Sequence, residues 1–197
     1  MDEKPGRAPP ADAPAAIVVK AGGRKYAFDK AFTRGEQIGK GSTALVYRAT
    51  RIGGAGGGEE VAAKVLDKAK FTAEEVAGLL KEADILRELP THPNIIKFHA
   101  LYNDGPEATL VLELIGGGDV FDRLCVKRQG CYKEPDARAL VKTLIVVLGH
   151  LEAHGIVHRD LKLASLMLRS KGSDSDFVSR HVWRAVRKRG KGFDRFA

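Results

Sequence analysis

Residues 155–170 have the sequence GIVHRDLKLASLMLRS, in which a turn precedes a short apolar strand candidate at 166–168. The turn carries a carboxylate, Asp160, and an ammonium, Lys162. A carboxylate in such a loop can accept a proton from a hydroxyl nucleophile, and the ammonium can neutralise a phosphoryl group in transfer. His158 alone would be interpreted as a buried core residue. The stretch therefore indicates phosphoryl transfer, with Asp160 and Lys162 as catalytic candidates.

Glycines alternate in an upstream segment, IGKGSTALVY at 38–47, which lies between two strand candidates. Gly39 and Gly41 allow a hairpin backbone to fold closely over phosphates, and Val46 can lie on a purine face. An ordinary hairpin has the same pattern, so the interpretation needs support from elsewhere in the chain. A second run, GGAGGG at 53–58, has no such support and is interpreted as a flexible connection.

That support comes from a lysine and a glutamate that follow the glycines. In VAAK at 61–64 a predicted strand presents Lys64 beside the small Ala62, and Glu82 lies on the predicted helix that follows. A lysine at a strand end is usually a solvated side chain. A helix carboxylate can, however, hold such a lysine toward nucleotide phosphates. Glycine hairpin, lysine and glutamate in this order are more specific than any one of them.

The first half of the chain has the pattern of a small sheet. From about Tyr26 to Leu112, short apolar runs alternate with turn residues, which predicts five antiparallel strands. One helix interrupts them at 71–89, where apolar residues recur at helical spacing behind Thr72 as the N-cap.

The second half has a helical pattern after Gly116. Pro135 suits the first turn of a helix at 134–154, and Gly155 suits its end. This helix is apolar on nearly all sides, so we expect other elements to cover it. Together the two halves predict an α+β fold.

The three motifs occur in the order and spacing of eukaryotic protein kinases, and the chain resembles that family from about Gly35 to Leu168. Lys162 resembles the serine/threonine branch rather than the tyrosine branch. The segments GGDVFDRL and SKGSDSD are similar to calcium/calmodulin-dependent and calcium-dependent kinases. The resemblance implies a protein-kinase-like fold that stops after the catalytic loop. Its expected parts are a disordered leader at 1–24, an N-lobe at 25–113, a partial helical C-lobe at 114–170 and a basic tail at 171–197.

The resemblance assigns a role to each residue that matches the family's motifs. Lys64 would hold the α- and β-phosphates of ATP and pair with Glu82, and Asp160 would be the catalytic base. The other residues expected around the nucleotide are Ile38, Gly39, Gly41, Val46 and Ala62 above it, Leu112 as gatekeeper, Glu113 to Ile115 in the hinge, Asp119 near the ribose, and Met167 below the adenine.

The sequence departs from the family where magnesium is bound. Ser165 stands in place of an asparagine, and a hydroxyl is a poorer ligand than an amide carbonyl. No Asp-Phe-Gly follows the catalytic loop, and Asp176 and Phe177 match it only superficially because Val178 replaces the glycine. The family's cofactors are ATP and magnesium. We expect Ser165 to hold magnesium weakly and this chain to transfer phosphate poorly.

The net charge of +8 is unevenly distributed over the 197 residues. Residues 177–197 contain seven basic residues against one acid, Asp194, and match no core element. Val178, Val182 and Val186 recur at four-residue intervals beside Trp183 in this tail, as in helices that bind calmodulin or an anionic surface. The preferred interpretation is a solvated basic end, or an out-of-register segment from an imperfect gene model. The rest of the chain is nearly balanced, which argues against a nucleic-acid partner.

No apolar run is long enough to span a membrane, and the first residues lack the pattern of a secretory signal. The two cysteines, Cys125 and Cys131, match neither a disulfide framework nor a zinc site. We therefore expect a soluble protein of the cytoplasm, with the nucleus as the alternative.

Two functions stay open on the sequence alone. One is a serine/threonine kinase domain that transfers the γ-phosphate of ATP to a protein substrate. The alternative is a pseudokinase-like module that binds a nucleotide weakly or docks on a partner protein.

Overall fold

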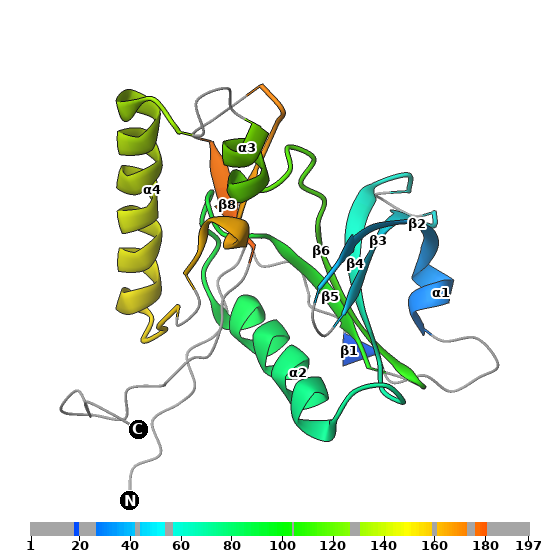
Figure 1. Cartoon of the computed structure of the whole chain (residues 1–197). Coiled ribbons are helices and arrows are strands. Elements are labelled where there is room, and N and C mark those ends of the chain that lie inside the picture. The colour runs from blue at the N-terminus through cyan, green and yellow to red at the C-terminus, as the bar shows by residue number, and fades with distance from the viewer. Residues whose placement is uncertain are drawn as a thin grey trace, which may run out of the picture.

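The computed structural model describes residues 18–19, 27–41, 44–53, 57–103, 105–126, 131–158, 161–172 and 176–180. Its largest element is a six-stranded sheet with the strand order β1-β5-β6-β4-β3-β2. In Figure 1 this sheet, with α1 and α2, occupies one side of the molecule, and α3, α4 and β8 occupy the other. The strands of the sheet are β1 (Val18–Val19), β2 (Phe32–Lys40), β3 (Leu45–Arg51), β4 (Glu60–Asp67), β5 (Phe98–Tyr102) and β6 (Glu107–Glu113).

The five antiparallel strands predicted from the sequence are β2 to β6, and this prediction is confirmed. Two further elements were not predicted. The short strand β1 lies inside the segment expected to be a disordered leader, and it pairs in parallel with Leu101 and Tyr102 of β5. The short helix α1 (Ala27–Ala31) precedes β2. Both are too short to leave a periodic signal in the sequence.

Helix α2 (Ala73–Glu88) packs its apolar side on β5 and β6. Thr72 is its N-cap, as predicted, and forms a capping box with Glu75. Leu79 and Leu86 belong to the main hydrophobic core, which also includes Leu110 of β6. A helix held at its start by a cap and along one face by the sheet can carry Glu82 in a fixed position.

A smaller core covers part of the sheet near α1. Phe28 and Phe32 stack with their ring centroids 5.5 Å apart, and Tyr102 meets both rings edge-on. All three rings are buried. The cluster ties α1 and β2 to β5, and it lies apart from the core beneath α2.

The remaining elements are α3 (Val120–Val126), α4 (Glu134–Ala153), a single 3-10 turn at Leu163–Ser165, β7 (Leu166–Leu168) and β8 (Phe177–Ser179). Pro135 lies in the first turn of α4, as predicted. Gly155 follows its end with φ of +72°, a conformation that favours glycine. Val147 and Leu151 of α4 join the main core. Its opposite face is not covered by the described residues: Val141, Ile145 and Val146 are 50%, 63% and 59% exposed.

Strand β8 corrects the expectation that the chain has no core element after residue 176. Its residues pair antiparallel with β7, and Phe177 and Val178 are fully buried. Asp176 lies outside this strand, with Oδ1 3.6 Å from Nε of Arg169. Two apolar residues between polar neighbours give too short a pattern to predict a strand, and pairing with β7 and backbone hydrogen bonds with Asn94 and Ile96 hold it in place. Asp176 and Phe177 are therefore the entry to a strand rather than a metal-binding motif.

Candidate functional site

Three neighbouring strands bring the glycine hairpin beside the lysine. Gly39 of β2 is paired with Val46 of β3, and Val46 is paired with Lys64 of β4. The Gly41 N–H donates to the carbonyl of Ala44 at 2.8 Å, which closes the hairpin. Ile38 is 41% exposed at its edge. The register thus places the hairpin formed by β2 and β3 directly beside Lys64 on the neighbouring strand β4.

Lys64 and Glu82 form the ion pair predicted from the sequence. Nζ of Lys64 donates to Oε2 of Glu82 at 2.6 Å. The two residues are only 9% and 5% exposed. Charges buried this far from water are tolerated only when they are paired and hydrogen-bonded. The pair therefore joins β4 to α2 at a fixed point and holds an ammonium toward the hairpin.

The wall beside this pair is apolar. Ala62 is paired with Leu112 of β6, and both are buried. Behind them, the carboxylate of Glu113 turns away from the candidate site, because it accepts from the backbone N–H of Lys97 at 2.9 Å and lies 3.5 Å from Arg169. Ile115 packs against the main core. The side chains of these two predicted hinge residues are thus engaged by Lys97, Arg169 and the main core.

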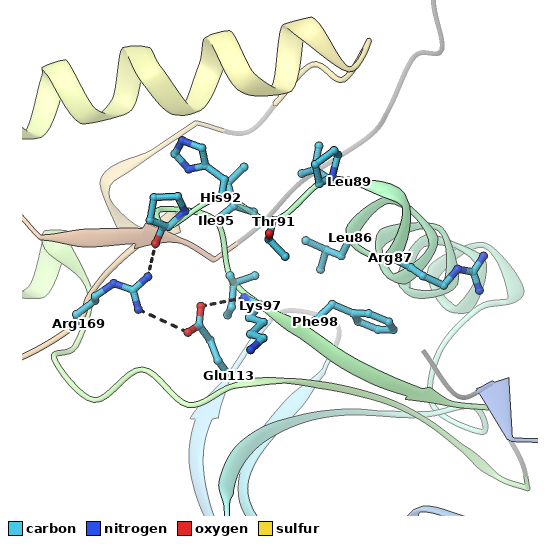
Figure 2. Close-up of a pocket in the computed structure, with 13 residues that line it drawn as sticks. Leu86, Arg87, Leu89, Thr91, His92, Ile95, Lys97, Phe98, Glu113 and Arg169 are labelled. Atoms are coloured by element: carbon cyan, nitrogen blue, oxygen red, sulfur yellow. Dashed lines mark hydrogen bonds and ion pairs between the residues drawn. The ribbon is translucent and has the colours of Figure 1, made fainter. Parts of the chain in front are cut away.

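Figure 2 shows the cavity behind this hinge, between the end of α2 and β5. Its volume is about 380 Å³, and apolar residues such as Leu86 and Phe98 line it. Arg169 crosses its rim and donates to the carbonyl of Pro93. Of the residues predicted to surround the nucleotide, Glu113 alone is among those that line this cavity. The cavity is therefore separate from the candidate nucleotide site.

The floor of the candidate site is held by a close backbone contact. The Gly117 N–H donates to Leu168 O at 3.0 Å, and the Leu168 N–H donates to Gly118 O at 2.8 Å. These bonds place Asp119 opposite Met167 in a two-residue β-bridge. Oδ1 of Asp119 accepts from the N–H of Asp122 at 2.7 Å and so caps the start of α3. The predicted ribose acid and the predicted adenine floor are thereby brought together.

The catalytic loop is described only in part. The predicted base Asp160 lies outside the described residues. Lys162 is exposed and its carbonyl accepts from the N–H of Ser165 at 2.9 Å. His158 is buried as expected, with Nε2 3.4 Å from Oγ of Ser179, and its Nδ1 has no hydrogen-bond partner among the residues that the structure describes.

The described residues do not fit a magnesium site held by the protein. Ser165, the predicted ligand, is fully buried, and its carbonyl accepts the N–H of Arg180 at 2.8 Å. Within the described part of the chain, no three His, Cys, Asp or Glu side chains are grouped so that they could hold a metal ion. Magnesium at a nucleotide is usually held by one or two protein carboxylates together with phosphate oxygens, and a buried serine hydroxyl does not replace such a carboxylate.

One charged residue near the floor was missed by the sequence analysis. Arg180 follows β8, and its Nη1 lies 3.8 Å from Sδ of Met167. The sequence held no signal for this position, because the register of β7 and β8 alone brings residue 180 next to residue 167.

A histidine stack links the loop after α2 to helix α4. The rings of His92 and His150 are 4.8 Å apart, and those of His150 and His154 are 4.6 Å apart. Burial, and to a lesser extent the neighbouring His150, lower the pKa of His92. The Nδ1 of His92 accepts from the N–H of Asn94 at 3.1 Å, which also favours the neutral ring.

Comparison with known proteins agrees with this fold. Residues 32–178 match the protein kinase domain. The chain is 36% identical over 157 residues to a CDPK-related protein kinase of Daucus carota, covering 79% of this chain and 26% of that protein. It is 36% identical over 147 residues to myosin light chain kinase A of Dictyostelium discoideum, covering 73% and 46%. It is 37% identical over 142 residues to calcium/calmodulin-dependent protein kinase type IV of Mus musculus, covering 71% and 28%.

The chain therefore belongs to the protein kinase family, and its relatives include serine/threonine kinases of the CDPK and calcium/calmodulin-dependent type. It spans less than half of the length of each of them. In the described part of the chain, none of the helices has the length and apolar character needed to cross a bilayer.

Proposed function

We propose that this chain binds ATP between the glycine hairpin and Met167, as the nucleotide-binding part of a serine/threonine protein kinase. The observation that supports the proposal most is the buried pair of Lys64 and Glu82, which lies in register with Gly39 and Val46. A buried cation costs free energy unless it is paired. A cation held so tightly beside a glycine hairpin is suited to an anionic ligand.

Each residue then has a defined part in the reaction. Lys64 contacts the α- and β-phosphates, and Glu82 fixes the ammonium in place. Ala62, Leu112 and Met167 enclose the adenine. Asp160 accepts the proton of the substrate hydroxyl, and Lys162 neutralises the phosphoryl group as it moves to the serine or threonine of a protein.

A second candidate is a pseudokinase-like module that binds nucleotide without transferring phosphate. The burial of Ser165 favours this candidate, because it removes the remaining predicted protein ligand for magnesium. The two candidates share the nucleotide site and differ in the transfer step.

A thermal-shift titration with ATP, with and without magnesium, tests the shared step. A ligand that binds only the folded protein stabilises it by about 2.7 kcal/mol at a hundred times its Kd. We expect stabilisation by ATP in the wild type and in Lys81→Ala, whose side chain is exposed on the same helix as Glu82. We expect no stabilisation in Lys64→Ala. A wild type that ATP does not stabilise contradicts the proposal.

Transfer of ³²P from ATP to a mixed serine/threonine peptide library separates the two candidates. Magnesium-dependent incorporation that Asp160→Asn abolishes supports the kinase. Stabilisation by ATP without incorporation supports the pseudokinase-like module.

The partners and location of the protein remain predictions. Capture by calmodulin or by anionic vesicles, lost when residues 181–197 are removed and strand β8 is kept, would support the interpretation of the basic tail. Imaging of a tagged full chain tests the cytoplasmic location.

A further inference from the structure

The backbone after β8 continues its pairing with β7 for one more residue. Ser179 is paired with Leu166, and the Arg180 N–H donates to Ser165 O at 2.8 Å. Arg180 therefore keeps the alternation of the strand. Val178 and Arg180 point to one side of the hairpin, and Ser179 points to the other, where it contacts His158.

The side to which Arg180 points is the side of the proposed nucleotide. Met167 is paired with Val178, so its side chain lies on the same side, opposite to that of the buried Leu166 and Leu168. Nη1 of Arg180 is 3.8 Å from Sδ of Met167. Arg180, a residue of intermediate exposure, thus has its guanidinium beside the side chain that we expect to form the floor of the proposed site.

This position places a permanent positive charge in a region where the described residues form no metal-binding group. Ser165 is fully buried, and the described residues form no metal-binding group. The residues that follow Arg180 are His181, Val182 and Trp183, none of which is a carboxylate. A triphosphate still needs its charge neutralised, and a guanidinium binds phosphate oxygens in a bidentate manner.

We propose that Arg180 contacts a phosphate of the bound nucleotide and provides charge that a divalent cation would otherwise provide. The site then binds ATP or ADP without metal. This inference rests on the proposed nucleotide site and adds a binding residue and a metal-independent mode of binding to it.

Isothermal titration calorimetry of the full chain tests the inference with adenosine and ATP, in EDTA and in magnesium. The variants are Arg180→Gln, Arg180→Lys and the control Arg138→Gln, which changes an exposed arginine of α4 that pairs with Glu134. We expect the wild type and the control to bind ATP in EDTA. We expect Arg180→Gln to weaken ATP by about tenfold, the equivalent of about 1.4 kcal/mol, and adenosine by less than about twofold. Arg180→Lys should keep part of the affinity.

Three results would overturn the inference while leaving the nucleotide site in place. They are equal ATP affinity in wild type and Arg180→Gln, equal loss of adenosine and ATP, and tighter ATP binding in Arg180→Gln because the arginine fills the site. A wild type that binds neither ligand contradicts the proposed function itself. Should Arg180→Gln fail to fold, Arg180→Lys and the dependence of wild-type ATP affinity on EDTA still decide the question.

Discussion

The sheet with α2 and the part formed by α3, α4 and the β7–β8 hairpin differ in how complete they are. The sheet carries a buried core on α2 and the ion pair of Lys64 and Glu82 at 2.6 Å. The other part contains α4, which leaves Ile145 63% exposed, and a buried serine where the family binds metal. The sheet is covered by α2, whereas one apolar face of α4 is not covered by the described residues.

This difference separates holding a nucleotide from using it. The proposed binding of a nucleotide needs a fixed cation, a close backbone and an apolar slot, and the sheet contains Lys64, the glycine hairpin and the buried Ala62 for these parts. Phosphoryl transfer also needs the terminal phosphate and the attacking hydroxyl to be positioned while their charge is neutralised. The residues proposed to position them, Asp160 and Lys162, belong to the second part. The described residues of that part form no metal site.

Among the substitutions that test this difference between the two parts, Lys64→Met is expected to change the free energy of unfolding most. Glu82, which is 5% exposed, would lose the ammonium that pairs with it. Removing one partner of a buried pair costs about 3 kcal/mol or more. Urea denaturation should show this loss in the free energy of unfolding. The double variant Lys64→Met with Glu82→Leu should recover most of it, and a double variant as unstable as the single one would contradict the buried-pair account.

The second effect concerns the contact between the two parts. A Cβ at Gly117 would lie 2.2 Å from the carbonyl oxygen of Leu168, whereas a Cβ at Gly116 meets nothing within 4 Å. Gly117→Ala should therefore reduce the free energy of unfolding by about 1–3 kcal/mol, since overpacking against backbone forces a shift. Gly116→Ala is the matched control and should stay within about 0.5 kcal/mol of the wild type. Equal stability of the two variants would contradict the close packing of this linker on β7.

The sequence predicted the elements whose residues carry a local signal. The strands β2 to β6, the cap at Thr72 and both ends of α4 follow from propensity and periodicity. The pairing of Lys64 with Glu82 was predicted from the resemblance, and the structure confirms it.

The features that the sequence did not predict depend on contacts between distant segments. Strand β8 exists because β7 pairs with it, and the same register brings Arg180 to Met167. The carboxylate of Glu113 turns away from the site because Lys97 and Arg169 bind it on the far side. No periodic pattern in a single sequence encodes such pairings.

A third prediction concerns the histidine stack that joins the two parts. The pKa of His92 is lower in the folded protein than in the unfolded chain, so the unfolded chain binds more protons. Stability should therefore be complete above the unfolded pKa of about 6.5 and decrease as the pH falls below it. His99, whose pKa burial also lowers, contributes in the same direction.

Thermal unfolding of the wild type and His92→Asn between pH 8 and pH 5 measures this effect. The asparagine oxygen can replace Nδ1 as acceptor for the N–H of Asn94 and does not titrate. The variant should lose less stability on acidification than the wild type. The difference between the two proteins should be smaller than the loss of stability expected for Gly117→Ala. Parallel pH curves for the two proteins would show that His92 does not contribute.

The smallest effect on stability is expected on the exposed face of α4. Ile145→Lys should change the free energy of unfolding by less than about 0.5 kcal/mol, because the side chain is already in water. It should reduce self-association measured by light scattering, since Val141, Ile145 and Val146 form an exposed apolar patch. Lys142→Gln, a neighbouring exposed position, is the control and should leave self-association unchanged. A loss of stability above about 1 kcal/mol would mean that this face is buried.

The position of Lys64 relative to bound phosphates can be measured by labelling with an acyl phosphate of ATP. A lysine amine beside the phosphates attacks the acyl carbon, forms an amide and releases ATP. Mass spectrometry of the digested protein should find the acyl group mainly on Lys64, and excess ATP should suppress it there while exposed Lys81 is unaffected. Labelling of Lys64 no greater than that of Lys81, or labelling that ATP does not suppress, would contradict the proposal that the pair of Lys64 and Glu82 holds a nucleotide.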